Sequence, residues 1–566
     1  MIVSAISLWK KFNLKNPLSA SEWGIEEENG VKSSHVSYSG HKESDGSVRI
    51  YARYIRALKK GKQPAVLLLN DVGATPDEEL ATYFLKKGYA VLMPDYTGKM
   101  KTDGDGVLRT AYPPSLDYGN YEKEQGLRHM ADLPADKTTW FEWAYVALYS
   151  IEFLKAQEEI GNIGIVGIRT GGEIAWHAML SPHVKCGVPI NAIGWRSVHS
   201  IAKFSDNIAH NLSDNRHRYI AATESQSYAP YVKCPVLMLC ALHDPVFDCD
   251  RAYDTYSRIG NKDGNALAYS PESGVCIGHY ALADMDLFLE KNLKGREIYI
   301  PDTLNISLKE SPGGIEITVG SDKEGLLEEV GIYYAEGDVN HRCAERDWHQ
   351  VFKTDGRSVQ NGSVTHTVKP FAGASAAFAF AYAKYFNGFR VMSKISCKRL
   401  NNIVKNAVKS RMLFSGKEMD TFSVATHEEY SIGNIFLERE ALPKITTGYG
   451  NIKGAYSMGG IKTYKIGSPK YVPEENALLE FDAYSKESQE LRVEIKVSNI
   501  EKEDSYVCIV PIKGGGKWKR IILKAADFKE ETNGKPLRNF FEGNALSFDC
   551  AGDEELEFSI TNILWL

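Results

Sequence analysis

The chain has 566 residues, a length that accommodates about three or four domains of roughly 100–200 residues each. Hydrophobic residues make up 43% of it and charged residues 25%, which is typical of a globular protein and excludes a disordered or fibrous one. The net charge of -6 comes from 67 basic and 73 acidic residues. This balance gives no general basic field, so we expect no binding to nucleic acid or to an anionic membrane surface.

The sequence does not indicate a disulfide framework, a cysteine-rich zinc site or membrane insertion. The cysteines number 9, which is odd, and no pair has the Cys-x-x-Cys spacing of zinc and redox sites. No apolar run approaches the roughly 18 residues that a membrane-spanning helix needs. The opening MIVSAISLWKK has no basic segment ahead of its apolar residues, so we do not expect a signal peptide. We therefore predict a cytoplasmic protein, with a secreted mature form as the alternative.

The first half of the chain alternates between short apolar runs and helical patterns. Residues 65–69, 89–93 and 163–166 are continuous apolar runs of the kind found inside parallel sheets. Such alternation predicts βαβ units and a doubly wound, mostly parallel sheet. The other predicted strands are residues 34–39, 48–55, 188–190 and 236–239, and the predicted helices are residues 77–87, 140–157, 173–180, 252–259 and 282–292.

The chain divides into three predicted domains. The α/β domain covers residues 1–296, and its polar segment 196–231 is either a lid over a site or a surface insertion. Residues 297–400 show alternating strand patterns over about a hundred residues, which predicts an immunoglobulin-like sandwich. Residues 401–566 predict a larger antiparallel sandwich, a jelly roll. The predicted fold class is thus an α/β domain followed by two all-β sandwiches.

A glycine-rich turn joins the predicted strand 163–166 to the helix that follows it. Its sequence is Gly167-Ile-Arg169-Thr170-Gly171-Gly172. Small residues on both sides of a sharp strand-to-helix turn let the chain fold tightly and let the helix pack on the strand. In the Gly-x-Ser-x-Gly elbow of serine hydrolases, such a turn lifts the nucleophile above the sheet.

At this turn the sequence resembles the α/β-hydrolases, in particular acetyl-xylan esterases, cephalosporin deacetylases and dienelactone hydrolases. The three glycines match the Gly-x-Ser-x-Gly-Gly elbow of that family, and Arg169 occupies the serine position. The resemblance covers roughly residues 30–295. It implies an α/β-hydrolase fold and an esterase-like site at the elbow.

The resemblance also implies the remaining members of a catalytic triad. Asp244 follows the late strand 236–239, where the family has its triad acid, with Asp248 and Asp250 as nearby alternatives. His279 precedes the last predicted helix, where the family has its triad base. The chain order of Arg169, Asp244 and His279 is that of nucleophile, acid and base. Only the nucleophile is replaced.

The same comparison assigns an oxyanion loop. It comprises Asp71 and Val72, which follow strand 65–69, and Thr170, which follows the elbow apex. The Thr170 hydroxyl is the one candidate for a displaced nucleophile. Because it lies one residue past the apex, we do not expect it to face His279.

Arg169 itself has two interpretations. A guanidinium stays protonated at any working pH and has no lone pair with which to attack a carbonyl. It either pairs with Asp244 and closes the former site, or binds a carboxylate or phosphate through its planar donor fork. Tyr112 and Trp195 are candidates for lining a pocket beside it, although aromatic packing in the core is the commoner role.

The last part of the chain resembles jelly-roll carbohydrate-binding modules. The segments 517–528 and 546–565 carry the likeness, which is a hydrophobic signature of the fold and not of a sugar site. Trp518 is a candidate sugar-binding aromatic residue, with edge packing as the alternative. No compact acidic cluster indicates the structural calcium that some relatives hold, and we predict no cofactor.

Two functions remain open from the sequence. In the first, the protein is a pseudo-esterase that has lost serine chemistry and binds a glycan-derived or carboxylated ligand. In the second, it hydrolyses esters of acylated carbohydrates through a displaced nucleophile or a water activated by His279. The predicted partner in both is a small molecule or a carbohydrate.

Overall fold

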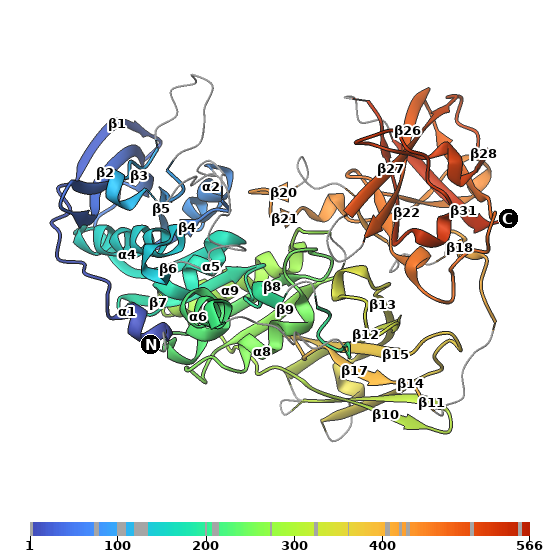
Figure 1. Ribbon diagram of the computed structural model, residues 1–566, viewed down its shortest axis with the longest axis horizontal. Coiled ribbons are helices and arrows are strands. Elements are labelled where there is room, and N and C mark those ends of the chain that lie inside the picture. The colour runs from blue at the N-terminus through green and yellow to red at the C-terminus, as the bar shows by residue number, and fades with distance from the viewer. Residues whose placement is uncertain are drawn as a thin grey trace.

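The computed structural model describes fourteen segments of the chain: residues 4–72, 78–98, 109–117, 134–198, 201–206, 214–271, 274–321, 326–359, 362–401, 408–417, 422–425, 431–498, 503–552 and 557–566. The hydrolase-type domain lies at one end of the long axis and the C-terminal sandwich at the other (Figure 1). A smaller middle sandwich lies below and between them in this view.

The first domain is built on a sheet of 9 strands in the order β1-β2-β3-β5-β4-β6-β7-β8-β9. The links from β1 to β5 are antiparallel and those from β5 to β9 are parallel. The strands are β1 (Ser21–Glu28), β2 (Val31–Glu43), β3 (Gly46–Ala57), β4 (Gln63–Leu69), β5 (Ala90–Asp95), β6 (Ile160–Ile168), β7 (Val184–Ile190), β8 (Leu237–Ala241) and β9 (Ala266–Ser270).

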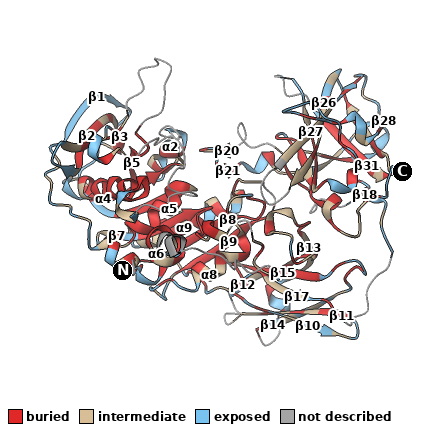
Figure 2. Ribbon diagram, in the orientation of Figure 1, coloured by how far each residue is buried: buried red, intermediate tan, exposed pale blue. Residues whose placement is uncertain are grey.

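Helices cover both faces of this sheet. Leu67 and Leu69 of β4 share a hydrophobic cluster with α4 and α5, whereas Val66 and Leu68 share another with α2 and α9. Both faces of a central strand are therefore buried, which is why these strands are continuous apolar runs (Figure 2). The helices are α1 (Ala5–Trp9), α2 (Glu78–Lys86), α4 (Thr139–Ala156), α5 (Thr170–Ala178), α6 (Asp214–Thr223), α7 (Ser225–Tyr228), α8 (Ala252–Tyr256) and α9 (His279–Lys294).

The predicted fold class is confirmed, and most predicted elements have a counterpart. Two strands, β1 and β9, were not predicted: β1 is exposed along its whole length and so shows no alternating apolar pattern. Helix α9 begins at His279, ahead of the predicted start at residue 282, so His279 lies in its first turn and does not precede it. Sequence patterns place helix ends poorly because no apolar face marks the first turn.

The middle sandwich consists of two antiparallel sheets. One has the order β10-β11-β14 and the other β13-β12-β15-β16, with β17 also paired to β15. Its strands are β10 (Asn305–Ser311), β11 (Gly314–Gly320), β12 (Leu327–Gly337), β13 (His349–Asp355), β14 (Ser363–Val368), β15 (Ala376–Tyr385), β16 (Arg390–Met392) and β17 (Ser396–Arg399).

The middle sandwich and the hydrolase domain share hydrophobic core. Strand β15 is buried on both faces: Phe378 and Phe380 pack in the cluster that contains Tyr269 of the hydrolase sheet, and Ala379 and Ala381 pack inside the sandwich. A bidentate ion pair between Arg346 and Asp250 crosses the same junction, with both side chains 0% exposed. These two parts are therefore joined by both apolar packing and buried charge.

A second buried carboxyl group lies at this junction. Asp284 on α9 accepts a hydrogen bond from the backbone N–H of Arg390 on β16 at 2.9 Å. Burial raises the pKa of Asp284 to about 8, while the Arg390 N–H and guanidinium oppose that rise. At neutral pH this carboxyl group is protonated in the folded protein.

Replacing Asp284 with asparagine is expected to change how stability depends on pH. In the unfolded chain Asp284 loses its proton near pH 4, but in the folded chain it holds the proton until about pH 8. The folded state binds the extra proton across this window, so the wild type loses up to about 1.4 kcal/mol of stability per pH unit as pH rises through it. The asparagine side chain keeps an acceptor for the Arg390 N–H. The free energy of unfolding of Asp284→Asn should therefore rise relative to that of the wild type from pH 5 to pH 8. Urea unfolding measures this, with the exposed Asp263→Asn as control; parallel curves for wild type and D284N would contradict it.

The C-terminal sandwich has two antiparallel sheets and its own hydrophobic cluster. One has the order β22-β23-β31-β25-β28 with β18 paired to β31, and the other has the order β19-β24-β30-β26-β27-β29. The strands are β18 (Met412–Phe414), β19 (Ser423–Val424), β22 (Lys444–Thr447), β23 (Lys453–Tyr456), β24 (Ile461–Thr463), β25 (Leu479–Ser485), β26 (Gln489–Ser498), β27 (Glu503–Ile512), β28 (Lys519–Leu523), β29 (Lys529–Glu530), β30 (Ala545–Cys550) and β31 (Phe558–Trp565).

A short hairpin from this C-terminal part reaches back to the hydrolase domain (Figure 1). It consists of β20 (Ser431–Ile432) and β21 (Phe436–Leu437). Ile277, two residues before His279, donates its N–H to Ile435 at 2.7 Å and accepts from Leu437 at 2.9 Å. Phe436 is fully buried in a cluster that includes residues of α9. The loop leading into α9 is thus held by a segment more than 150 residues away in the chain.

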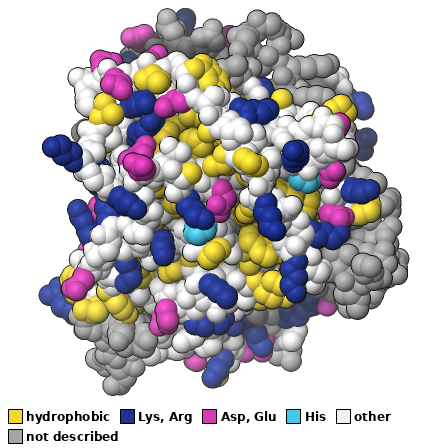
Figure 3. Space-filling view, turned by 90° about the vertical axis from the view of Figure 1, so that its left-hand side faces the viewer, with side chains coloured by type: hydrophobic (Ala, Val, Ile, Leu, Met, Phe, Trp, Pro, Cys, Tyr) yellow, Lys and Arg dark blue, Asp and Glu magenta, His cyan; other side chains and the backbone are white. Residues whose placement is uncertain are grey.

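The face on the left side of Figure 1 has basic and acidic side chains interspersed, with hydrophobic ones between them (Figure 3). Within the described segments, no helix is both long and apolar enough to cross a membrane.

Candidate functional site

The glycine-rich turn between β6 and α5 has the geometry of a strained elbow. Arg169 at its apex has φ 50° and ψ -111°, a backbone conformation that non-glycine residues rarely adopt. The flanking glycines allow the close packing: a Cβ on Gly171 would lie 2.2 Å from the Leu69 carbonyl oxygen, and one on Gly172 would lie 2.5 Å from Ala192 Cβ. The tight strand-to-helix turn predicted from the glycines therefore forms with an arginine at its apex.

The Arg169 guanidinium bridges two carboxylates of this site. Its Nη1 donates to Asp244 Oδ2 at 2.7 Å, and its Nε lies 3.0 Å from Asp71 Oδ2. The guanidinium also lies 5.6 Å from the centre of the Phe247 ring. Arg169 follows β6, Asp71 follows β4 and Asp244 follows β8, so the three meet at the carboxyl edge of the parallel sheet.

The Asp71 carboxylate also occupies the predicted oxyanion loop. Its Oδ1 accepts the backbone N–H of Val72 at 2.8 Å and that of Thr170 at 3.1 Å. These are the two amides that the family resemblance assigned to binding a developing oxyanion. A fixed negative charge now takes up their hydrogen bonds, and Arg169 neutralises that charge from the other carboxylate oxygen.

Asp244 is fully engaged within the protein. Its Oδ1 accepts the backbone N–H groups of Val246 at 2.8 Å and Phe247 at 3.1 Å, while its Oδ2 accepts from Arg169. It is 1% exposed. Burial raises the pKa of Asp244, and Arg169 together with the two backbone donors opposes that rise.

His279 is not joined to Asp244. Its Nδ1 is buried and has no hydrogen-bond partner among the residues that the structure describes. The ring lies 3.7 Å from that of Tyr280. Burial lowers the pKa of His279, and the positive charges of Arg390 and Arg439 lower it further. The imidazole is therefore neutral at neutral pH and lacks the acid that would orient it in a triad.

Thr170 does not reach a base either. Its residue is 0% exposed, and its Oγ1 has no hydrogen-bond partner in the described segments. Its contribution to the site is the backbone N–H that Asp71 accepts.

Cys276 lies close to the Arg169 network in the loop held by the β20–β21 hairpin. It is 1% exposed, and burial raises the pKa of its thiol, with Arg169 lowering it and Asp244 raising it. It packs with Val424 and Leu437 of the C-terminal part. The hairpin contact and this cluster bring C-terminal residues next to the elbow, which no local sequence pattern could have indicated.

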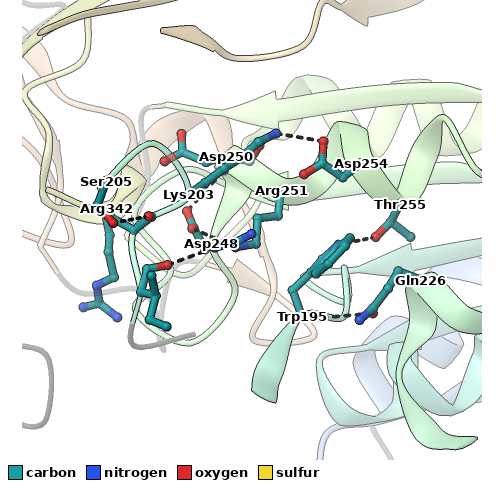
Figure 4. Close-up of polar contacts among 12 residues, drawn as sticks. Trp195, Lys203, Ser205, Gln226, Asp248, Asp250, Arg251, Asp254, Thr255 and Arg342 are labelled. Atoms are coloured by element: carbon teal, nitrogen blue, oxygen red, sulfur yellow. Dashed lines mark hydrogen bonds and ion pairs between the residues drawn. The ribbon is translucent and has the colours of Figure 1, made fainter. Parts of the chain in front are cut away.

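The two alternative triad acids are committed to other contacts. Asp250 pairs with Arg346 of the middle sandwich. Asp248 lies 3.8 Å from Arg251, and Figure 4 shows these two residues beside Asp250. Burial and the neighbouring Asp250 raise the pKa of Asp248 to about 6. Asp250 therefore belongs to the junction with the middle sandwich, whereas Asp248 pairs within the first domain.

Trp195 lies beside this cluster, where its indole N–H donates to Thr255 Oγ1 at 3.0 Å and its backbone N–H donates to Gln226 at 3.0 Å (Figure 4). The segment 196–231, predicted as a lid or insertion, is tied to α5 through Ser225, whose Oγ donates to buried Glu173 at 2.7 Å. Glu173 also accepts the N–H of Gly194, just ahead of the segment, at 2.9 Å. The described part of the segment is thus anchored by buried hydrogen bonds.

The other two predicted ligand-binding aromatics make hydrogen bonds elsewhere in the chain. The Tyr112 hydroxyl donates to the Tyr96 carbonyl at 2.6 Å. Trp518 precedes β28 in the C-terminal sandwich, where its indole N–H donates to Tyr449 at 3.1 Å and its ring lies 5.4 Å from that of Tyr484. The described residues contain no group of three or more His, Cys, Asp or Glu side chains that could hold a metal ion.

The N-terminal half of the chain is similar to known proteins. The model of the Dienelactone hydrolase family matches residues 51–266. A search of curated proteins found no match. Among solved structures, the chain is similar to an acetyl xylan esterase from Paenibacillus sp. R4, at 16% identity and a TM-score of 0.40, with 51% of this chain and 92% of that one covered. It is also similar to acetyl xylan esterase 1 from Thermoanaerobacterium sp. JW/SL YS485, at 16% identity and a TM-score of 0.37, with 48% of this chain and 86% of that one covered. Residues 51–266, which lie within the α/β domain, are thus similar to the dienelactone hydrolase family.

Proposed function

We propose that this protein is a pseudo-esterase: an esterase-like α/β-hydrolase that does not hydrolyse esters and acts by binding a ligand. The observation that carries the proposal is the network in which Arg169 pairs with Asp244 and Asp71 while Asp71 accepts from the Val72 and Thr170 amides. One internal network uses the nucleophile position, the triad acid and the oxyanion amides at the same time.

Ester hydrolysis needs a nucleophile, free oxyanion amides and an oriented base, and this arrangement supplies none of the three. The guanidinium at the elbow cannot attack a carbonyl. The amides that would stabilise a tetrahedral oxyanion already bind Asp71, and removal of even one such donor costs about 100–1,000-fold in turnover. In the described segments, no carboxylate bonds the His279 Nδ1 to orient its ring.

The two interpretations of Arg169 are not equally supported. Because its Nη1 and Nε already face carboxylates of the chain, a ligand carboxylate would have to displace Asp71 or Asp244. This favours Arg169 as an internal ion pair over Arg169 as a ligand clamp. A glycan-derived or carboxylated ligand remains our proposal for what the protein binds, through a site other than Arg169.

The alternative function is residual hydrolysis of acylated carbohydrates by activated water. The neutral His279 ring with its unbonded Nδ1 favours it, because a neutral imidazole can accept a proton from water. This route still requires an oxyanion site that Asp71 does not fill.

Hydrolysis of p-nitrophenyl acetate and acetylated xylo-oligosaccharides by the wild type and by Arg169→Ser tests the proposal. We expect no turnover above buffer for either protein, since a serine at position 169 would meet neither an oriented His279 nor open oxyanion amides. Turnover by the wild type would overturn the proposal. Turnover by R169S alone would keep the wild type a pseudo-esterase but show that the triad frame reassembles when the arginine is removed.

A further inference from the structure

A cavity of about 130 Å³ lies where α9 of the hydrolase domain meets the middle sandwich. Its polar lining includes Tyr280, Asp284, Glu329, Lys353 and Arg390, and we call it the Arg390 cavity. Arg169, Asp71 and Asp244 do not line it. It is therefore separate from the elbow network.

The Arg390 guanidinium makes no hydrogen bond or ion pair with any residue that the structure describes. Its carbon Cζ lies 3.6 Å from the centre of the Tyr280 ring and 5.7 Å from that of Tyr382. Stacking of this kind uses the face of the guanidinium and leaves its N–H edge for another partner. Five N–H donors that cannot be deprotonated require acceptors, either from water or from a ligand.

Asp284 supplies a second unused group to the same cavity. It is 1% exposed, and its Oδ1 accepts the Arg390 backbone N–H, but its Oδ2 is buried with no hydrogen-bond partner in the described segments. Because burial raises the pKa of Asp284 to about 8, this carboxyl group is protonated at neutral pH. A protonated carboxyl donates one hydrogen bond.

The remaining acid of the cavity is already paired. Glu329 on β12 accepts from the Tyr382 hydroxyl at 2.6 Å and lies 2.6 Å from Lys353 Nζ on β13. The charged groups that share the cavity with Asp284 are thus Arg390, Lys353 and Glu329. With Asp284 neutral, they leave one positive charge in excess.

We propose that the Arg390 cavity binds a small monocarboxylate, whose oxygens accept from the N–H edge of the Arg390 guanidinium and one of which also accepts from Asp284. A single negative charge matches the excess positive charge, and a planar carboxylate fits the donor fork of arginine. A phosphate would bring a second negative charge close to Glu329. The volume suits an acid of few carbon atoms. The inference rests on the proposed function, because it gives a site and a chemical class to the carboxylated ligand. The two can fail separately, since binding at the cavity and turnover at the elbow are measured in different experiments.

Such a ligand would join two parts of the chain. Asp284 belongs to α9, whose first turn contains His279, and Arg390 belongs to β16 of the middle sandwich. A ligand that bridges them binds only the folded junction, so it stabilises the protein as its concentration rises above its Kd.

Isothermal titration calorimetry of the full chain tests the proposal. The probes are propionate, lactate and glycolate, with propionamide and lactamide as neutral matches and inorganic phosphate as a competing anion. We expect the carboxylates to bind at pH 6, the amides to show no heat, and phosphate to bind at least tenfold more weakly. Binding should weaken at least threefold from pH 6 to pH 9, since Asp284 loses its proton in that interval and then repels the ligand.

Two variants separate the roles of the two groups. Arg390→Gln is expected to weaken carboxylate binding at least tenfold, whereas Arg357→Gln, at an exposed ion pair of the same sandwich, should leave it unchanged. Asp284→Asn keeps a donor and should bind within about threefold of the wild type at pH 6, but without the weakening at pH 9. Thermal unfolding in the absence of ligand checks that each variant is folded. The proposal is overturned if no carboxylate binds at 10 mM, if amides or phosphate bind as well as carboxylates, or if wild type and D284N show the same pH dependence.

Discussion

Replacing Arg346 with methionine is expected to lower the free energy of unfolding by about 3–5 kcal/mol. Arg346 and Asp250 are joined by two hydrogen bonds of 2.6 and 2.7 Å, and neither side chain is exposed. Arg346 also donates to the His341 carbonyl at 2.7 Å, and its Cζ lies 3.5 Å from the centre of the Phe378 ring. Methionine fills part of the volume but leaves the Asp250 carboxylate buried without its counter-charge. Most of the cost comes from that unpaired charge.

Urea unfolding followed by tryptophan fluorescence measures the effect on the hydrolase transition. The double variant Arg346→Met/Asp250→Asn removes both charges and should recover most of the loss, because the penalty belongs to the stranded carboxylate. The exposed pair of Arg357 and Asp355 provides the control, since Arg357→Met should leave the free energy of unfolding essentially unchanged. An Arg346→Met variant no less stable than Arg357→Met would show that the junction does not depend on this ion pair.

The second large effect is expected at the elbow, where Arg169→Met should cost about 2–3 kcal/mol at pH 7. This expected loss of stability is smaller than that for Arg346 because the Arg169 side chain is 23% exposed and its ion pairs are partly screened by solvent. The variant leaves buried Asp244 with only the Val246 and Phe247 N–H donors.

The cost at the elbow should grow with pH. Without Arg169, burial raises the folded-state pKa of Asp244 still further above its unfolded value of about 3.9. A carboxyl group with a raised folded-state pKa loses stability as pH rises from the unfolded value towards the folded one. Arg169→Met should therefore be closer to the wild type at pH 5 than at pH 8. Arg169→Met/Asp244→Asn should remove this pH dependence, and an equal cost at both pH values would contradict the role given to Asp244.

The residues of the elbow network could be predicted from the sequence because each lies at a fixed place relative to a strand. Asp71 follows β4, Arg169 follows β6 and Asp244 follows β8, and the carboxyl ends of parallel strands meet at one edge of a sheet. Their proximity follows from the βαβ order. What Asp71 does was not predicted: the sequence assigned its loop to the oxyanion amides, and only the geometry places its carboxylate on them.

Contacts between distant segments could not be predicted in this way. The pairing of Ile277 with the β20–β21 hairpin, the ion pair of Arg346 with Asp250, and the cavity between Asp284 and Arg390 join different parts of the chain. Hydrophobic alternation reports which face of an element is buried, not which remote element covers it. The same limit applies to His279, whose position in the chain matches a triad base but whose ring is not placed against Asp244.

The most direct test of the central claim compares initial rates of p-nitrophenyl acetate hydrolysis by the wild type and by His279→Ala at equal concentrations. If Arg169 and Asp71 close the site, the two proteins should give the same rate as buffer containing an equal amount of an unrelated protein. A wild-type rate that rises in proportion to enzyme concentration and is abolished in H279A would contradict the account, because it would require a working base and an open oxyanion site at the elbow.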